Sequence, residues 1–193
     1  MNTITVQLPA ARLWLRVARP EWTAPLDPTY AQRAGGRWNP PKSFPTLYLN
    51  ADVLTAQLQI ERLLRDTPVY PEDLSDDAYR LVLARLPDTR PAADAVSDDG
   101  LRAIGLPETY PVDHTGQLID QSACQTIGAS ITTQSLSAMW CRSACSADGQ
   151  GRELAWFCGA KRARSVGQAL PYGRWRFANG WADLKVPEQV DPQ

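Results

Sequence analysis

The chain has few of the residues from which metal sites and activated thiols are usually built. Its 193 residues include one histidine, His114, and four cysteines, none of which are arranged as the CxxC pairs typical of zinc sites. A single histidine cannot complete a common ligand set, so we expect no metal cofactor. Because no second histidine is available to activate a cysteine, a thiol nucleophile is also disfavoured.

The chain also lacks a charge excess and a long apolar run. Its 20 basic and 21 acidic residues give a formal charge of −1, so no broad electrostatic field favours nucleic acid or an anionic membrane. No segment approaches the roughly 20 apolar residues of a membrane helix, and no secretory leader is recognisable at the N-terminus. We therefore expect a cytoplasmic protein with no direct nucleic-acid or membrane partner, although a small anionic ligand is compatible with this composition.

What the chain does contain is enough apolar material for one core. Hydrophobic residues make up 44% of the sequence, and neither an internal repeat nor a linker divides it. We expect a single domain over residues 1–193, with an aromatic-rich C-terminal extension over 170–193. The aromatic residues of that extension predict either a last strand or an arm that docks on the body, and they could form a surface for a homo-oligomer or another partner.

Short strands with few helices predict an α+β fold rather than a doubly wound parallel sheet. Alternating and β-rich stretches predict strands, and residues spaced by 3.6 positions predict an amphipathic helix. Ser97 or Asp98 is a candidate cap for a short helix that Gly105 terminates. The expected strands are 12–18, 46–50, 79–86, 137–142 and 153–158, and the longer expected helices are 51–66 and 118–129.

The most distinctive segment is GGRWNPPKSFPTLYLN, residues 35–50. Its two glycines allow a close backbone approach, and Arg37 offers a forked cation suited to phosphate. Trp38 and Tyr48 supply flat faces for a planar ring. An ordinary loop, with Trp38 in the core and Arg37 solvated, explains the same residues, so the segment alone does not identify a function.

The wider sequence resembles the RES domain family, which is named for an arginine, a glutamate and a serine. Arg16 in LWLRVARPEW matches the arginine strand that precedes the GGRWN segment. TLYLN and Thr55–Ala56 resemble the strand and helix start that follow it. Ser143 in WCRSACSADGQGRELAWF resembles the serine before a glycine turn and an apolar strand. The resemblance covers residues 12–160.

This resemblance implies a fold similar to ADP-ribosyltransferases, with two small β-sheets around an NAD cleft and flanking helices. Family members are toxins that consume NAD. They cleave its nicotinamide–ribose bond by phosphorolysis or hydrolysis, or they transfer its ADP-ribose to an acceptor. The resemblance also implies an Xre-like helix-turn-helix antitoxin as partner, which covers the entrance of the active site. No motif in the sequence decides whether phosphate, water or another acceptor takes the ADP-ribose.

The chemistry of NAD suggests a role for each matching residue. Arg16 and Arg37 are candidates to bind the pyrophosphate, and Tyr48 could stack on nicotinamide or hold the adjacent ribose. Ser143 could orient a phosphate, the ribose or a catalytic carboxylate. Because cleavage builds positive charge on the sugar, a carboxylate near the ribose would stabilise the transition state.

The glutamate of the family is the one clear departure, because its position falls on Gln59. Glu61 lies two positions later, and two helical residues span about 200°, so the two side chains cannot exchange roles without a local shift. A helical projection places Glu61 between Leu54 and Leu64, inside the apolar arc. This favours Glu61 as the catalytic carboxylate, with Gln59 as an NAD-binding residue. The alternatives are a structural ion pair for Glu61, or a nucleotide- or partner-binding module with weak or no catalysis.

Overall fold

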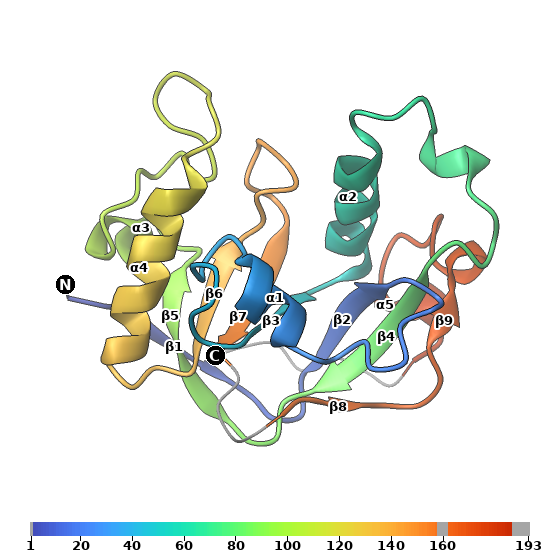
Figure 1. Ribbon diagram of the computed structural model, residues 1–193, viewed down its shortest axis with the longest axis horizontal. Coiled ribbons are helices and arrows are strands. Elements are labelled where there is room, and N and C mark those ends of the chain that lie inside the picture. The colour runs from blue at the N-terminus through green and yellow to red at the C-terminus, as the bar shows by residue number, and fades with distance from the viewer. Residues whose placement is uncertain (1, 158–161, 187–193) are drawn as a thin grey trace.

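The computed structural model describes residues 2–157 and 162–186, and within them it contains nine strands and five α-helices (Figure 1). The strands are β1 (Thr5–Leu8), β2 (Leu13–Ala18), β3 (Thr46–Asn50), β4 (Arg80–Arg85), β5 (Arg90–Ala95), β6 (Ala138–Arg142), β7 (Arg152–Phe157), β8 (Arg164–Ser165) and β9 (Leu170–Pro171). The helices are α1 (Thr29–Ala34), α2 (Val53–Leu64), α3 (Asp98–Ala103), α4 (Gln121–Thr133) and α5 (Trp181–Leu184), and two 3-10 turns cover Pro71–Asp73 and Tyr172–Arg174.

The described strands form one mostly antiparallel sheet in the order β1-β5-β6-β7-β3-β2-β4-β8, with β9 also paired to β4. Among the described strands, β5 and β6 are the one parallel pair. The expectation of two separate small sheets is therefore wrong. The sheet nevertheless has two halves, because β2 and β3 meet at a single residue pair, Leu15 and Asn50, whereas β2 pairs with β4 over its whole length. We call this junction the seam.

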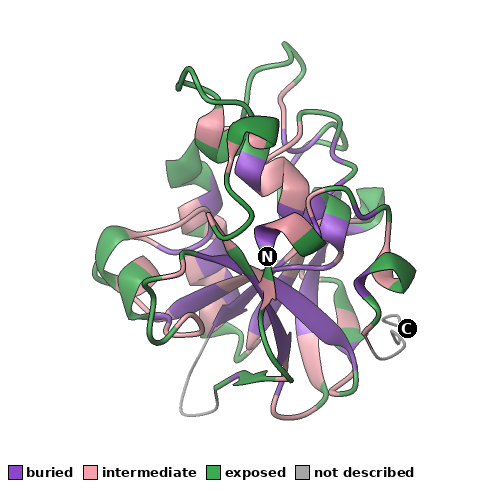
Figure 2. Cartoon of the chain, turned by 90° about the vertical axis from the view of Figure 1, so that its right-hand side faces the viewer, coloured by how far each residue is buried: buried purple, intermediate pink, exposed green. Residues whose placement is uncertain are grey.

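Each half of the sheet has its own core and its own long helix. On the β6–β7 side, α4 contributes Cys124 and Ile131 to a cluster with Met139. On the β2–β4 side, α2 contributes Val53 and Ile60 to a second cluster. The two helices rise on the same side of the sheet, with β6, β7 and β3 between them (Figure 1). The strands in the middle are buried, whereas the outer faces of the helices are exposed (Figure 2).

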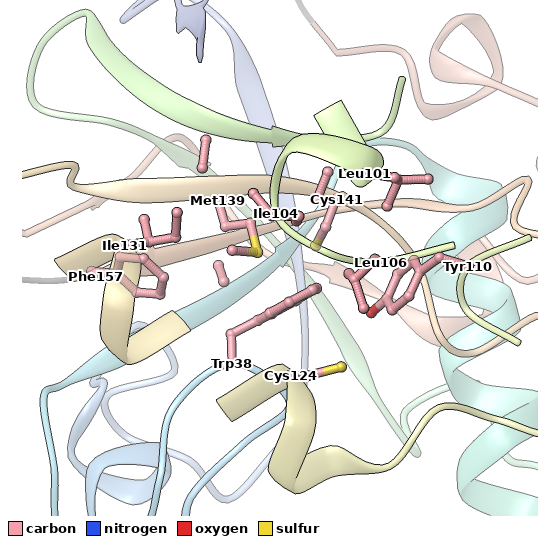
Figure 3. Close-up of a cluster of buried hydrophobic side chains, with 13 residues drawn as sticks. Trp38, Leu101, Ile104, Leu106, Tyr110, Cys124, Ile131, Met139, Cys141 and Phe157 are labelled. Atoms are coloured by element: carbon pink, nitrogen blue, oxygen red, sulfur yellow. The ribbon is translucent and has the colours of Figure 1, made fainter. Parts of the chain in front are cut away.

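Close backbone packing attaches α4 to the segment before β3. Gly128 lies so near Trp38 that an added Cβ would stand 1.8 Å from the Trp38 carbonyl oxygen. The Trp38 side chain then enters the core of the β6–β7 half, where Figure 3 shows its ring between Cys124 and Met139. Only a glycine permits this approach, so the position of the segment before β3 depends on the small size of residue 128.

The C-terminal segment is docked on the β2–β4 half. Tyr172 and Trp175 are buried in the same cluster as α2. The side-chain amide of Gln57 on α2 donates to the carbonyls of Trp175, Arg176 and Ala178, at 2.8, 3.1 and 2.9 Å. The prediction of a docked arm is confirmed, and the alternative of a last strand is reduced to the two residues of β9.

Most of the elements predicted from periodicity are present. Ser97 caps α3 by accepting from the Gly100 amide at 3.0 Å, and the chain after α3 turns at Gly105, where φ is +80°. The sequence analysis did not predict β1, α1, β5, β8, α5 or the two 3-10 turns. The sequence of β5, RPAADA, contains little of the β-branched or aromatic character that identifies a strand, and tertiary pairing with β1 and β6 determines its conformation. The end of the predicted strand 153–158 at Cys158 lies outside the described residues.

Candidate active site

Tyr48 on β3 organises the segment that precedes its strand. Its hydroxyl accepts from the Trp38 amide and donates to the Asn39 side-chain oxygen, both at 2.8 Å. An added Cβ at Gly36 would lie 2.5 Å from the Tyr48 ring. The ring can therefore occupy this position only because residue 36 has no side chain. Burial raises the pKa of Tyr48, and the phenol therefore stays protonated. Tyr48 thus holds the loop, in addition to any ligand contact through the partly exposed ring.

Arg16 lies at the seam. One terminal nitrogen, Nη1, donates to the Tyr48 carbonyl at 2.8 Å, and the guanidinium carbon lies 5.8 Å from the Trp22 ring centroid. Its Nε is buried and has no hydrogen-bond partner in the part of the chain that the structure describes. Burial lowers the pKa of Arg16, which the charge of Glu153 partly offsets. The result is a cation with unused donor capacity, as an anionic ligand requires.

A cavity of about 810 Å³ opens beside Arg16. Gln59 and Leu63 of α2 line it together with Trp22, Tyr30 and Tyr79, so it offers flat apolar surfaces as well as polar groups. Trp22, Tyr30 and Leu63 are exposed large hydrophobic residues. Arg16 and Gln59, two residues predicted from the sequence, therefore face one cavity.

Arg37 belongs to the other half of the sheet and does not line this cavity. Its Nε donates to the Tyr110 hydroxyl at 3.3 Å, and its guanidinium carbon lies 5.6 Å from the Tyr110 ring centroid. Its Nη2 is buried without a partner among the described residues. The two arginines thus resemble each other, because each is held by one neighbour and retains an unpaired nitrogen.

Trp38 is part of the core. Its side chain is 1% exposed, and its ring lies 5.7 Å from the Tyr110 ring. This agrees with the interpretation in which the tryptophan fills the core. The contact with NAD that we expected from Trp38 has no exposed surface on which to form, so that expectation is corrected.

Ser143 is fully buried, and it binds a carboxylate that the sequence analysis missed. The Ser143 hydroxyl donates to Oε1 of Glu153 on β7 and accepts from the Cys145 amide at 3.1 Å. The Cys145 thiol also faces Oε1, at 3.6 Å. Burial raises the pKa of Glu153, whereas these two hydrogen bonds and the charges of Arg37 and Arg62 lower it. Ser143 is therefore hydrogen-bonded to an acid, and its predicted role in orienting a catalytic carboxylate stays a prediction.

Asn50 connects this acid to Gln59. In the sheet, Asn50 pairs with Glu153, and partners in an antiparallel ladder place their side chains on the same face. The Asn50 side-chain amide donates to Gln59 Oε1 at 2.9 Å. A polar row therefore runs across the sheet from Gln59 through Asn50 to Glu153 and Ser143.

Glu61 does not lie where the helical projection placed it. Its side chain is exposed, and it does not line the cavity. Leu54 and Leu63 are 51% and 52% exposed, so the buried arc of α2 is narrower than the apolar sequence pattern suggests. The expectation of a buried-face acid is wrong, while the catalytic role of Glu61 stays a prediction for substitution to test.

One signal in the sequence could have identified Glu153. It is an acid near the start of an otherwise apolar strand, ELAWF, directly after the glycine turn that follows Ser143. An acid in such a strand needs a partner. The described residues contain no group of three or more histidine, cysteine or acidic side chains that could hold a metal ion. In the same residues, no helix has the length and apolar character needed to cross a bilayer.

Comparison with known proteins identifies a family and a fold. A protein-family model described as the RES domain matches residues 13–177. The NAD(+) phosphorylases MbcT of Mycobacterium bovis and Mycobacterium tuberculosis are 33% identical over 98 residues, which are 51% of this chain and 50% of each relative. The match thus spans about half the length of these relatives. The crystal structure of the M. tuberculosis MbcT–MbcA toxin–antitoxin complex superposes with a TM-score of 0.70 at 22% identity, over 90% of this chain and 92% of that one.

Proposed function

The chain belongs to the RES family, and from this premise we propose that it is a toxin-type enzyme that cleaves NAD at the nicotinamide–ribose bond. The observation that carries the proposal is the cavity in which Arg16, with an unpaired buried nitrogen, stands beside Gln59 and several aromatic rings. Its volume of about 810 Å³ is in the range of ligand sites, roughly 300–1,000 Å³.

Each half of the sheet would contribute to NAD binding. Arg16 and Arg37 would provide the cationic donors for the pyrophosphate, because each retains a buried nitrogen that has no partner among the described residues. Tyr48 and Gln59 lie near the seam, where the ring and the amide suit nicotinamide and the ribose hydroxyls. This arrangement, with the ligand held between two halves of the fold, is the ADP-ribosyltransferase-like part of the proposal.

Phosphate is the acceptor that the relatives favour, because those that match half of this chain are NAD(+) phosphorylases. In this reaction the C–N bond between ribose and nicotinamide breaks, and its electron pair leaves with neutral nicotinamide. A phosphate oxygen forms the new bond to the anomeric carbon. Hydrolysis and ADP-ribose transfer differ only in the acceptor.

The proposed partner is an antitoxin of the Xre-like helix-turn-helix class. The structural relative was solved as a toxin–antitoxin complex. In this chain the exposed side chains of Trp22, Tyr30 and Leu63 line the cavity, which offers apolar surface for a protein that blocks access to it. The proposed setting is the cytoplasm, where the free cysteines Cys124, Cys141 and Cys145 stay reduced.

Gln59 supports a second candidate function. A glutamine can bind ribose hydroxyls, but it has no charge to stabilise a developing cation, so a module that binds NAD without cleaving it fits the same cavity. The experiment that separates the two functions is incubation of the pure protein with NAD, with and without phosphate, followed by mass spectrometry. We expect free nicotinamide and a phosphorylated ADP-ribose. NAD binding without nicotinamide would favour the module, and the absence of both would reject both functions.

A further inference from the structure

The proposed reaction needs a negative charge near the ribose, and Gln59 cannot provide it. We infer that Glu153 is the catalytic carboxylate of this chain and that Ser143 is its positioning residue. The inference rests on the proposed function, and it assigns the missing charge of that site to β7 instead of α2.

The first support is the arrangement of the polar row across the sheet. Asn50 pairs with Glu153 in the ladder and donates its side-chain amide to Gln59 at 2.9 Å. Gln59 and Glu153 therefore flank the same asparagine. A ligand whose ribose contacts Gln59 has Glu153 as the nearby acid of the same row. Neither Glu153 nor Glu61 lines the cavity itself, but Glu61 is exposed and has no place in this row.

The second support is how the carboxylate is held. Ser143 Oγ and Cys145 Sγ both approach Oε1, while Oε2 accepts no hydrogen bond from the described residues. A purely structural acid in this position would be expected to use both oxygens. Glu153 keeps part of its surface exposed, so Oε2 is the oxygen available to a substrate.

The close packing of the turn before β7 fixes Ser143 against this acid. The Ser143 amide donates to the Gly151 carbonyl at 2.7 Å. An added Cβ at Gly151 would stand 2.8 Å from the Ser143 Cβ. The Arg152 amide donates to Thr55 Oγ1 at 3.0 Å, which connects the same turn to α2. The serine and the acid are therefore preorganised relative to both halves of the fold.

Positively charged neighbours partly offset the effect of burial on this acid, whose pKa is raised. Arg37 and Arg62 lower the pKa of Glu153, against the upward effect of burial, and Glu153 in turn raises the pKa of Arg16. Both candidate pyrophosphate arginines thus interact electrostatically with this one carboxylate. In the reaction the ionised Glu153 stabilises the positive charge that develops on the ribose, and it exchanges no proton.

The decisive variant is Glu153→Gln, which keeps the shape and the acceptor for Ser143 and removes the charge. We expect the rate of nicotinamide release to fall by about 100-fold or more, while the Kd for NAD measured by calorimetry changes little. Glu72→Gln is the matched control, because Glu72 is exposed and distant in sequence from the polar row. Glu61→Gln tests the competing assignment in the same assay.

A second variant moves the charge back to the family's position. In the double variant Gln59→Glu, Glu153→Gln, the carboxylate stands on the other side of Asn50, and we expect part of the lost rate to return. If Glu153→Gln does not fold by circular dichroism, Glu153→Asp replaces it. That variant keeps the charge and withdraws it by one methylene, so kcat should fall while KM changes little.

The outcomes separate this inference from the function on which it rests. If the native chain releases no nicotinamide, the proposed function fails. If the native chain is active and folded Glu153→Gln, or its aspartate replacement, retains full kcat, the Glu153 assignment is overturned while the function stands. If Glu61→Gln is the inactive variant, the carboxylate belongs to α2. The inference is supported if Glu153→Gln releases nicotinamide more slowly and the double variant recovers part of the lost rate.

Discussion

The two arginines that the sequence matches to segments of the RES family lie in differently built halves of the molecule. Arg16 is on β2 at the seam and faces a cavity beside α2. Arg37 is in a loop on the β6–β7 half and is held by Tyr110 against the α4 core. The half with the cavity contains Gln59, and the half without it contains Ser143 and Glu153.

This difference indicates a division of labour. Under the proposed function, the β2–β4 half would provide space and aromatic surface, whereas the β6–β7 half would provide the acid and its serine. The halves share one ladder pair at the seam, so a dinucleotide that contacts both would bridge the weakest junction of the sheet. Variants in the two halves should therefore differ in whether they impair NAD binding, the rate of cleavage or the stability of the fold.

The largest effect is expected for Arg16→Ala. Removing the cation from the cavity should lower kcat/KM for nicotinamide release by about 1,000-fold, because the dinucleotide loses a charge-assisted contact in a partly buried site. Arg16→Lys keeps the charge but not the fork, and it should recover only part of the loss. Arg37→Ala is the matched variant in the other half. Equal activity of native protein and Arg16→Ala would remove Arg16 from the site.

Gly128→Ala should produce the largest loss of stability among the variants considered. The new Cβ would meet the Trp38 carbonyl oxygen at 1.8 Å, which forces α4 and the segment before β3 apart. We expect the free energy of unfolding to fall by about 2–3 kcal/mol, measured by urea denaturation. Gly180→Ala is the control, since its φ is 176° and no atom of the described residues lies within 4 Å of the added Cβ. Equal losses in the two variants would contradict close packing at Gly128.

Tyr48→Phe tests the junction between the loop and β3. The substitution removes the hydroxyl that accepts from the Trp38 amide and donates to Asn39. It leaves buried polar groups without partners, so we expect a loss of about 1–3 kcal/mol in unfolding free energy. The phenylalanine ring retains the stacking surface, and NAD binding should weaken less than in Arg16→Ala. A stable variant with normal unfolding would show that the hydroxyl does not hold the loop.

Glu153→Gln should have the smallest effect on stability. We expect the variant to be slightly more stable than the native protein, although it is less active. Burial raises the pKa of Glu153, and a carboxyl whose pKa is higher in the folded state destabilises that state when ionised. The variant and the native protein should therefore be equally stable well below the ordinary glutamate pKa, about 4.3. The variant should become the more stable one as the pH rises through the raised pKa.

Thermal unfolding of both proteins from about pH 3 to about pH 8 measures this difference, because this range starts well below the ordinary glutamate pKa. The other charged and titratable groups that act on Glu153 are unchanged in the variant, so they cancel in the comparison. They are Arg16, Arg37 and Arg62 together with Cys141, Cys145 and Tyr48. A native protein that is the more stable of the two at pH 8 would indicate a structural ion pair in place of a retained functional acid.

Several elements of the fold that carry the site could be predicted from residues that are close in sequence. The strands at 12–18 and 46–50, the helix after them and the Ser97 cap follow from periodicity and capping chemistry. Gln59 was recognised as the departure from the family pattern by position alone. The projection of α2 was less reliable, because apolar type does not show which leucines a neighbouring element covers, and Leu54 and Leu63 are both exposed.

The sequence by itself determined the family, the main strands and helices, and the residue types available for NAD chemistry, because these depend on local spacing and on side-chain identity. The tertiary structure decided which residues meet. The pairing of β3 with β7 places Glu153 beside Asn50 and Gln59, and no local pattern encodes contacts between segments separated by a hundred positions. Long-range strand pairing and close packing decide which residues lie near one another, and they bring Glu153 of β7 next to Asn50.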